Sequence, residues 1–74
     1  MRSIREIASE IETDWTKVNF AARPYLDAMY SLDSVSDSYG LDSGQSVVAY
    51  FLANAGTWRG DRARAIKAEL KEML

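Results

Sequence analysis

Residues 42–60, which read DSGQSVVAYFLANAGTWRG, decide the fold of this chain. Asp42 or Ser43 can accept hydrogen bonds from the free amides of a first helical turn, and Gly56 stands where a left-handed residue would end the helix. Between these signals, apolar side chains recur at helical spacing: Val47, Val48, Phe51, Leu52 and Ala55. The stretch therefore predicts a central helix over 43–55 in a small bundle.

Two helices are expected before this stretch. Ser3 and Glu6 have the spacing of a capping box, and an apolar face follows them, which predicts a helix over 4–14. Pro24 suits a first helical turn, where its missing amide costs nothing, and it opens a predicted helix over 24–32.

The remaining segments predict one short turn and one long helix. Residues 32–42 are rich in serine and aspartate, and we expect a helical turn from Val35 to Tyr39, capped by Asp33 and closed by Gly40. Thr57 can cap a last helix over 58–73. Its expected buried stripe comprises Ala63, Ile66, Leu70, Met73 and Leu74.

The sequence predicts an all-α fold without a sheet, because no run reads as an alternating strand bounded by turns. Residues 1–74 are expected to form a single domain, an irregular bundle of four to five short helices. Its core should hold the largest apolar side chains: Trp15, Phe20, Phe51, Trp58 and Ile66.

The composition excludes several chemistries. The 74 residues include no cysteine and no histidine, so disulfides, thiol nucleophiles, zinc sites and histidine-dependent triads are absent. We expect no enzymatic activity and no cofactor. No apolar run approaches the ~20 residues of a membrane span, and no apolar signal core follows Met1, so we expect a cytoplasmic protein that does not bind membranes.

Three short motifs have a structural and a functional interpretation. Asp33, Asp37 and Asp42 do not have the spacing of a calcium loop, so capping is favoured over metal binding. Residues 42–44, Asp-Ser-Gly, match the aspartic-protease tripeptide but are expected to open a helix, whereas the protease needs two aspartates on hairpin loops. Residues 59–61, Arg-Gly-Asp, match an integrin-binding tripeptide, and chance occurrence is favoured.

Arg59 would fall in the apolar stripe of a helix over 58–73. It must therefore lie outside the regular helix, extend to water, or pair with an acid, for which Asp14 and Asp27 are candidates.

Two surfaces could bind a partner. Leu26 and Tyr30 widen the apolar arc of the helix over 24–32, so they are either enclosed by 16–23 and 33–41 or form an exposed ledge for a partner or a second copy. Asp27 and Asp33 would then favour a basic partner. The second surface is basic and could contact nucleic-acid phosphates, or could be an ordinary solvated helix face: Arg62, Arg64, Lys67 and Lys71. The net charge of −2 makes nucleic acid the less favoured partner.

Several short runs share a pattern with one group of proteins: Trp15 and Val18, residues 24–29 (PYLDAM), 37–40 (DSYG), 42–44 (DSG), 50–55 (YFLANA) and 57–60 (TWRG). In these runs the chain resembles small proteins carried by phages and integrated mobile elements of Gram-positive bacteria. The resemblance implies a genomic setting and no mechanism. By analogy with small helical proteins of such origin, we expect a non-enzymatic protein-interaction module, an accessory or inhibitor protein. The alternative is a nucleic-acid-associated module.

Overall fold

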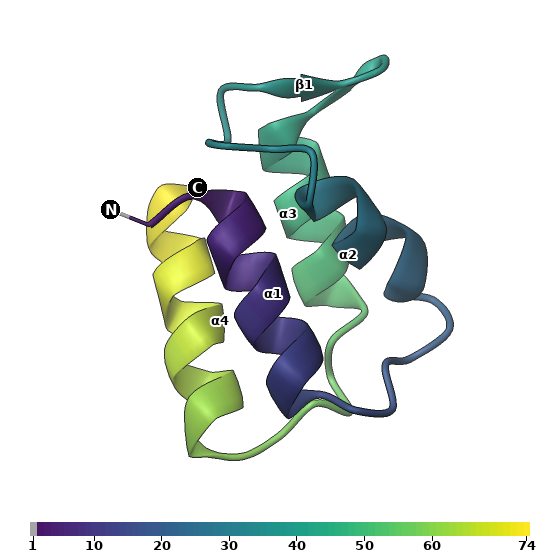
Figure 1. Ribbon diagram of the computed structural model, residues 1–74, viewed down its shortest axis with the longest axis vertical. Coiled ribbons are helices and arrows are strands. Elements are labelled where there is room, and N and C mark those ends of the chain that lie inside the picture. Colours follow the sequence, from purple (N-terminus) through teal and green to yellow (C-terminus); the bar gives the residue numbers. More distant parts are fainter. Residues whose placement is uncertain (1) are drawn as a thin grey trace.

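The computed structural model describes residues 2–74, which form four helices and one antiparallel pair of short strands (Figure 1). In chain order the elements are α1 (Ile4–Asp14), α2 (Arg23–Met29), β1 (Ser38–Tyr39), β2 (Asp42–Ser43), α3 (Gly44–Ala53) and α4 (Asp61–Met73). The mostly helical prediction is confirmed. The all-α prediction is wrong, because β1 and β2 pair where a helical turn was expected.

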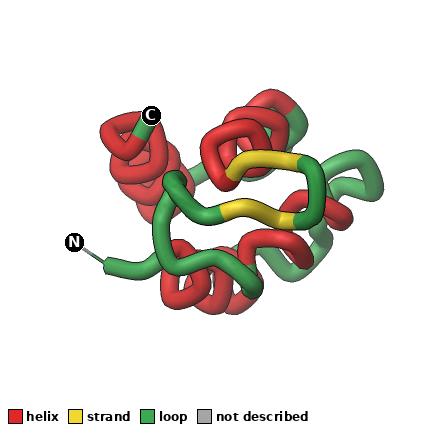
Figure 2. Tube along the Cα trace, turned by 90° about the horizontal axis from the view of Figure 1, so that it is seen from above, coloured by secondary structure: helices red, strands yellow, loops and turns green. Residues whose placement is uncertain are grey.

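Helix α1 packs against α4 and α2, and α3 packs against the same two helices, so the four helices surround a common core (Figures 1 and 2). Seen from above, the β1–β2 hairpin covers the end of the bundle at which α3 begins (Figure 2). None of the helices within residues 2–74 has both the length and the apolar character needed to cross a membrane.

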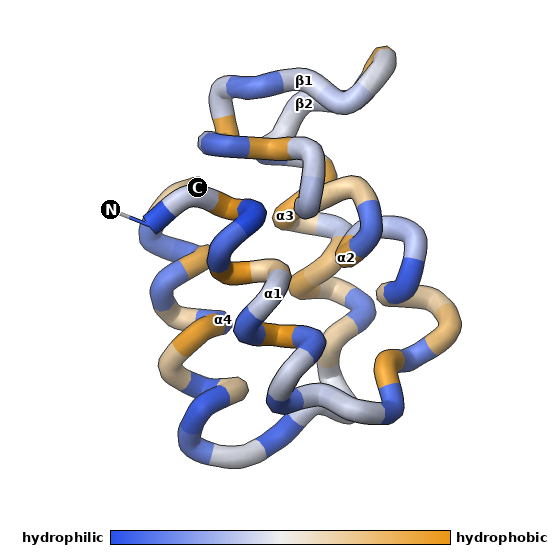
Figure 3. The backbone as a smooth tube through the Cα atoms, in the orientation of Figure 1, coloured by the Kyte–Doolittle hydropathy of each residue, from blue (hydrophilic) through white to orange (hydrophobic). Residues whose placement is uncertain are grey.

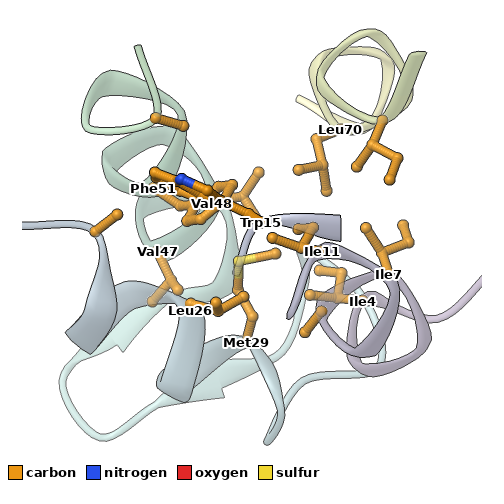
Figure 4. Close-up of a cluster of buried hydrophobic side chains, with 14 of the residues drawn as sticks. Ile4, Ile7, Ile11, Trp15, Leu26, Met29, Val47, Val48, Phe51 and Leu70 are labelled. Atoms are coloured by element: carbon orange, nitrogen blue, oxygen red, sulfur yellow. The ribbon is translucent and has the colours of Figure 1, made fainter. Parts of the chain in front are cut away.

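One apolar core joins all four helices (Figure 4), and three aromatic rings pack against one another within it. The Trp15 and Trp58 rings stack with centroids 5.7 Å apart. Phe51 has no exposed surface and meets both tryptophans edge-on, at 6.1 and 6.4 Å. Burial is confirmed for these three residues and for Ile66.

Phe20 is the exception, because 93% of it is exposed. The connection between α1 and α2 is held by its neighbours instead: the Asn19 side chain donates to the Asn54 carbonyl at 3.2 Å, and Ala22 is fully buried. The turn between these two anchors directs Phe20 to solvent. The prediction that Phe20 is buried is therefore wrong.

The helix starts predicted from capping residues within one turn are confirmed for α1 and α3. The Ser3 amide donates to the Glu6 carboxylate at 3.1 Å and the Glu6 amide donates to the Ser3 hydroxyl at 3.3 Å, which completes the capping box of α1. Ser43 caps α3 by accepting from the Ser46 amide at 3.0 Å. Both assignments are confirmed.

Other boundaries differ from the prediction. Helix α2 ends at Met29 instead of residue 32, and α3 ends at Ala53 without a left-handed Gly56. Helix α4 begins at Asp61, and its N-cap is Gly60 with φ +114°, so the prediction that Thr57 caps it is wrong. The reason lies in residue 58, which leaves the helical path to bury its indole in the core.

The hairpin closes through a two-residue turn at Gly40 and Leu41. Gly40 has φ +62°, which suits a two-residue turn with glycine at its first central position. Within residues 2–74, only glycines have a positive φ. The predicted helical turn from Val35 to Tyr39 is wrong, because residues 38 and 39 pair with 43 and 42. Figure 3 shows the hairpin as largely polar, with an apolar segment at its tip.

Residues 32–37, here called the capping segment, supply main-chain carbonyls to the starts of two helices. The amides of Ile4 and Arg5 in α1 donate to the carbonyls of residues 33 and 32, both at 3.0 Å. The amides of Gly44 and Gln45 in α3 donate to those of residues 37 and 35, at 2.6 and 3.0 Å. The segment thus ties α1 and α3 together at one end of the bundle.

Candidate functional site

Of the two alternatives for Leu26 and Tyr30, the structure does not form the exposed ledge on α2. Leu26 has no exposed surface and packs in the core near Met29 and Val47 (Figure 4), so its assignment to a partner surface is wrong. The physical reason is that α2 packs closely on α3 through this side chain. Tyr30 is 40% exposed, and its hydroxyl donates to the Ala8 carbonyl at 3.4 Å.

The two aspartates assigned to the same surface are already paired. Asp27 accepts from Arg23 at 2.9 Å, and Arg23 also reaches Glu12. Asp33 pairs with Arg5 at 3.0 Å. Their charges are therefore compensated within the chain, and the structure does not bring the four predicted residues into one site.

Other large apolar side chains are exposed at Phe20, Leu41 and Tyr50, and Tyr25 is half-buried against the core. We call these four residues the apolar face. Tyr25 of α2 stacks on Tyr50 of α3 with ring centroids 5.5 Å apart, and Tyr50 is 55% exposed. Leu41 lies at the hairpin tip and is fully exposed. In Figure 1 the hairpin tip and the α1–α2 connection project toward the same side of the molecule, the tip at the top, over α3, and the connection at the lower right, where it leads into α2.

The sequence carried a signal for one part of this face. A glycine followed by one residue is a known two-residue hairpin loop, and Gly40-Leu41 fits it. An apolar residue at such a tip has no neighbouring layer to cover it. No comparable local signal marked Phe20, whose exposure depends on how the α1–α2 connection is anchored.

The predicted basic surface is only partly formed. Arg62 lies on the flank of α4 that faces α1, where it pairs with Glu10 at 3.1 Å and approaches Asp14 to 4.0 Å. Including Arg62 in the basic face was therefore wrong. Arg64 and Lys71 are exposed, and Lys67 is half-buried.

Lys67 lies over Trp58, near the end of the α3–α4 connection. Its Nζ donates to the Trp58 carbonyl at 2.6 Å and lies 5.8 Å from the centroid of the Trp58 ring. Burial lowers the pKa of Lys67, and the positive charges of Lys71 and Arg59 lower it further. No carboxylate within residues 2–74 lies at ion-pair distance from any of these three cations.

A cavity of about 250 Å³ lies beside this lysine, and we call it the cationic pocket. Its lining residues are Trp58, Arg59, Gly60, Ala63, Arg64 and Lys67. Arg59 precedes α4 and is exposed. This is the first of the three alternatives that the sequence allowed for it, a position outside the regular helix. Neither expected partner reaches it: Asp14 accepts from the indole Nε1 of Trp58 at 2.8 Å, and Asp27 pairs with Arg23.

The short motifs have structural roles in the part of the chain that is described. Asp37 accepts from the amides of Asp33 and Ser34 at 2.8 and 3.2 Å, which is a local capping contact. No three acidic side chains of residues 2–74 gather in a way that could hold a metal ion. Residues 59–61 are exposed and lead directly into α4.

Two surfaces thus remain as candidates, the apolar face beside α2 and the cationic pocket at the start of α4. They share no residue. Comparison of the chain with protein-family models, with curated proteins and with solved structures finds no match.

Proposed function

We propose that this protein is a non-enzymatic protein-interaction module whose partner binds the apolar face. The observation that carries this function is the near-complete exposure of Phe20 and Leu41, together with the half-exposed Tyr50 that stacks on Tyr25. Single exposed apolar side chains are ordinary, whereas several on one side of a small protein are typical of interaction sites.

The chemistry of the face favours a protein over a small molecule. Aromatic residues, tyrosine among them, are enriched in protein interfaces, since they offer apolar area with a polar tip. Asp42 adjoins Leu41 at the hairpin tip and has no cationic partner within residues 2–74. A partner with an apolar centre and a basic rim therefore fits this surface best.

The genomic setting implied by the resemblance narrows the proposed role. A phage or mobile element would use such a protein as an accessory or inhibitor that covers a partner's surface. This role needs no catalytic step and no cofactor. A second copy of the chain is the other occupant that the face could accept, which would make the protein a homodimer.

The experiment compares one double variant with a matched control. Phe20→Ser with Leu41→Ser removes exposed apolar area only, so the monomer should stay folded, as judged by circular dichroism. Leu74→Ser removes an exposed apolar side chain at the end of α4 and serves as the control. Each protein is used to capture partners from host lysate, and its mass in solution is measured by light scattering.

We expect the same captured protein, or the same dimer, with the parent and with Leu74→Ser, and neither with the double variant. Equal capture by the folded double variant would show that the partner binds elsewhere. The nucleic-acid alternative is less well supported, because Arg62 is paired with acids of α1.

A further inference from the structure

We propose that the cationic pocket binds a single phosphate group, presented by a small phosphomonoester. The pocket shares no residue with the apolar face, so this inference is independent of the proposed function.

The first reason is an unbalanced charge. Three cations, Arg59, Arg64 and Lys67, line the cavity, and no acid does. The chain has 11 acidic and 9 basic residues, so acids are not scarce. Four other arginines each contact a carboxylate directly: Arg2, Arg5, Arg23 and Arg62.

The cations of the pocket lack such partners within residues 2–74. No carboxylate lies within ion-pair distance of Arg59 or Lys67. Arg64 approaches only Asp61, at 3.7 Å, and both side chains are largely exposed. Such an exposed pair contributes little, so Arg64 can turn to a ligand at small cost. A bound phosphomonoester, with a charge of about −2 at neutral pH, would compensate most of this positive charge.

The second reason is that one donor is already held in place. An ammonium group has three N–H donors, and the Trp58 carbonyl accepts one from Lys67, which leaves two for a ligand. The arginines add planar donor pairs that match phosphate oxygens. The first amides of α4 follow Gly60, which has no side chain to cap them, and this adds a favourable helix-dipole contribution.

The size and surroundings of the pocket favour one phosphate over a nucleic acid. A cavity of about 250 Å³ accommodates a phosphate and a few attached atoms. Trp58 is only 3% exposed, so no aromatic platform is offered to a base. The adjoining flank of α4 faces Glu10 and Asp14, whose charges would repel a long polyanion.

The test is a titration of isotopically labelled protein with inorganic phosphate, and then with glycerol phosphate, at constant ionic strength. Backbone amide signals are followed by NMR. We expect saturable shifts clustered at residues 59, 60, 63 and 64 and at the Trp58 indole, with glycerol phosphate binding at least as tightly as inorganic phosphate.

Two variants separate the pocket from general charge effects. Arg59→Gln removes an exposed side chain without an ion-pair partner and should keep the fold while weakening phosphate affinity about tenfold, as loss of a charged hydrogen bond does. Arg5→Gln removes the same charge in the first turn of α1, at the end of the bundle away from the pocket (Figure 1), and should leave the phosphate affinity unchanged.

Three results would overturn the inference. Shifts that grow linearly with phosphate and never saturate would mean non-specific association. Equal affinities of Arg59→Gln and the parent would place the anion elsewhere. Tighter binding of a DNA duplex than of glycerol phosphate, falling steeply with salt, would assign these cations to nucleic acid.

Discussion

Replacing Phe51 with alanine should remove a large part of the stability of this protein. The side chain is fully buried beside the stacked rings of Trp15 and Trp58 and meets both edge-on. Buried phenylalanine-to-alanine changes cost about 3–5 kcal/mol. The two edge-on ring contacts each add about 0.5–1.5 kcal/mol beyond buried area, which places Phe51→Ala in the upper part of that range. At ~0.05–0.15 kcal/mol per residue, a chain of this length has a total of only about 4–11 kcal/mol.

The assay is urea unfolding followed by circular dichroism and by tryptophan fluorescence. Phe20→Ala makes the same chemical change at a site that is 93% exposed, and it should alter the free energy of unfolding by less than about 0.5 kcal/mol. If Phe51→Ala leaves too little folded protein to measure, Phe51→Leu should still unfold measurably, at a loss of about 1–2 kcal/mol. Equal losses for Phe51→Ala and Phe20→Ala would refute the proposed centre of the core.

Two further predictions concern the ends of helices. Gly44→Ala should destabilise the protein by about 1–3 kcal/mol in urea unfolding, as overpacking does, because an added Cβ would lie 2.8 Å from the Ser34 carbonyl oxygen. Gly56→Ala is its control, because a Cβ added there meets nothing within 4 Å. Equal effects of the two substitutions would contradict the close approach at Gly44. Hydrogen bonds from the Ser3 amide and then its hydroxyl hold the pKa of Glu6 below its ordinary value of 4.5, so this carboxylate stabilises the fold above pH 4.5 and the contribution is lost as the pH falls through the lowered pKa. Glu6→Gln should flatten the dependence of the urea midpoint on pH in that acidic window, and an unchanged slope would contradict it.

The parts of the fold that follow from local chemistry could be predicted from the sequence. Ser3 and Glu6 define the start of α1, and Ser43 defines the start of α3, because each cap needs only residues within one turn. The start of α4 could not be placed this way. It depends on Trp58, whose indole reaches Asp14 and the core, and such long-range contacts leave no local pattern.

The sequence does not predict the β1–β2 hairpin for a related reason. Its strands have two residues each and carry no buried side chain, so the alternation that marks a strand is absent. The pair is held by Gly40 at the turn and by the close approach of Gly44 to the capping segment. Only the turn was visible in the sequence.

The candidate surfaces were predictable in part. At ~100° per residue, Arg62 and Arg64 are far apart around a helix, so the sequence already separated Arg62 from the basic face. The burial of Leu26 and the exposure of Phe20 depend on which neighbours cover each side chain. Neither follows from the periodicity of a single helix.

The capping segment has a consequence for amide hydrogen exchange. The first amides of a helix have no partner within it and usually exchange quickly with solvent. Here the leading amides of α1 and α3 are held by carbonyls of the same six-residue stretch, 32–37. Their protection therefore ends in one shared opening event, although the two helices are far apart in the chain. When residues 32–37 detach, the first turns of both helices lose these hydrogen bonds together. The four amides should therefore exchange with deuterium at rates limited by the same opening step.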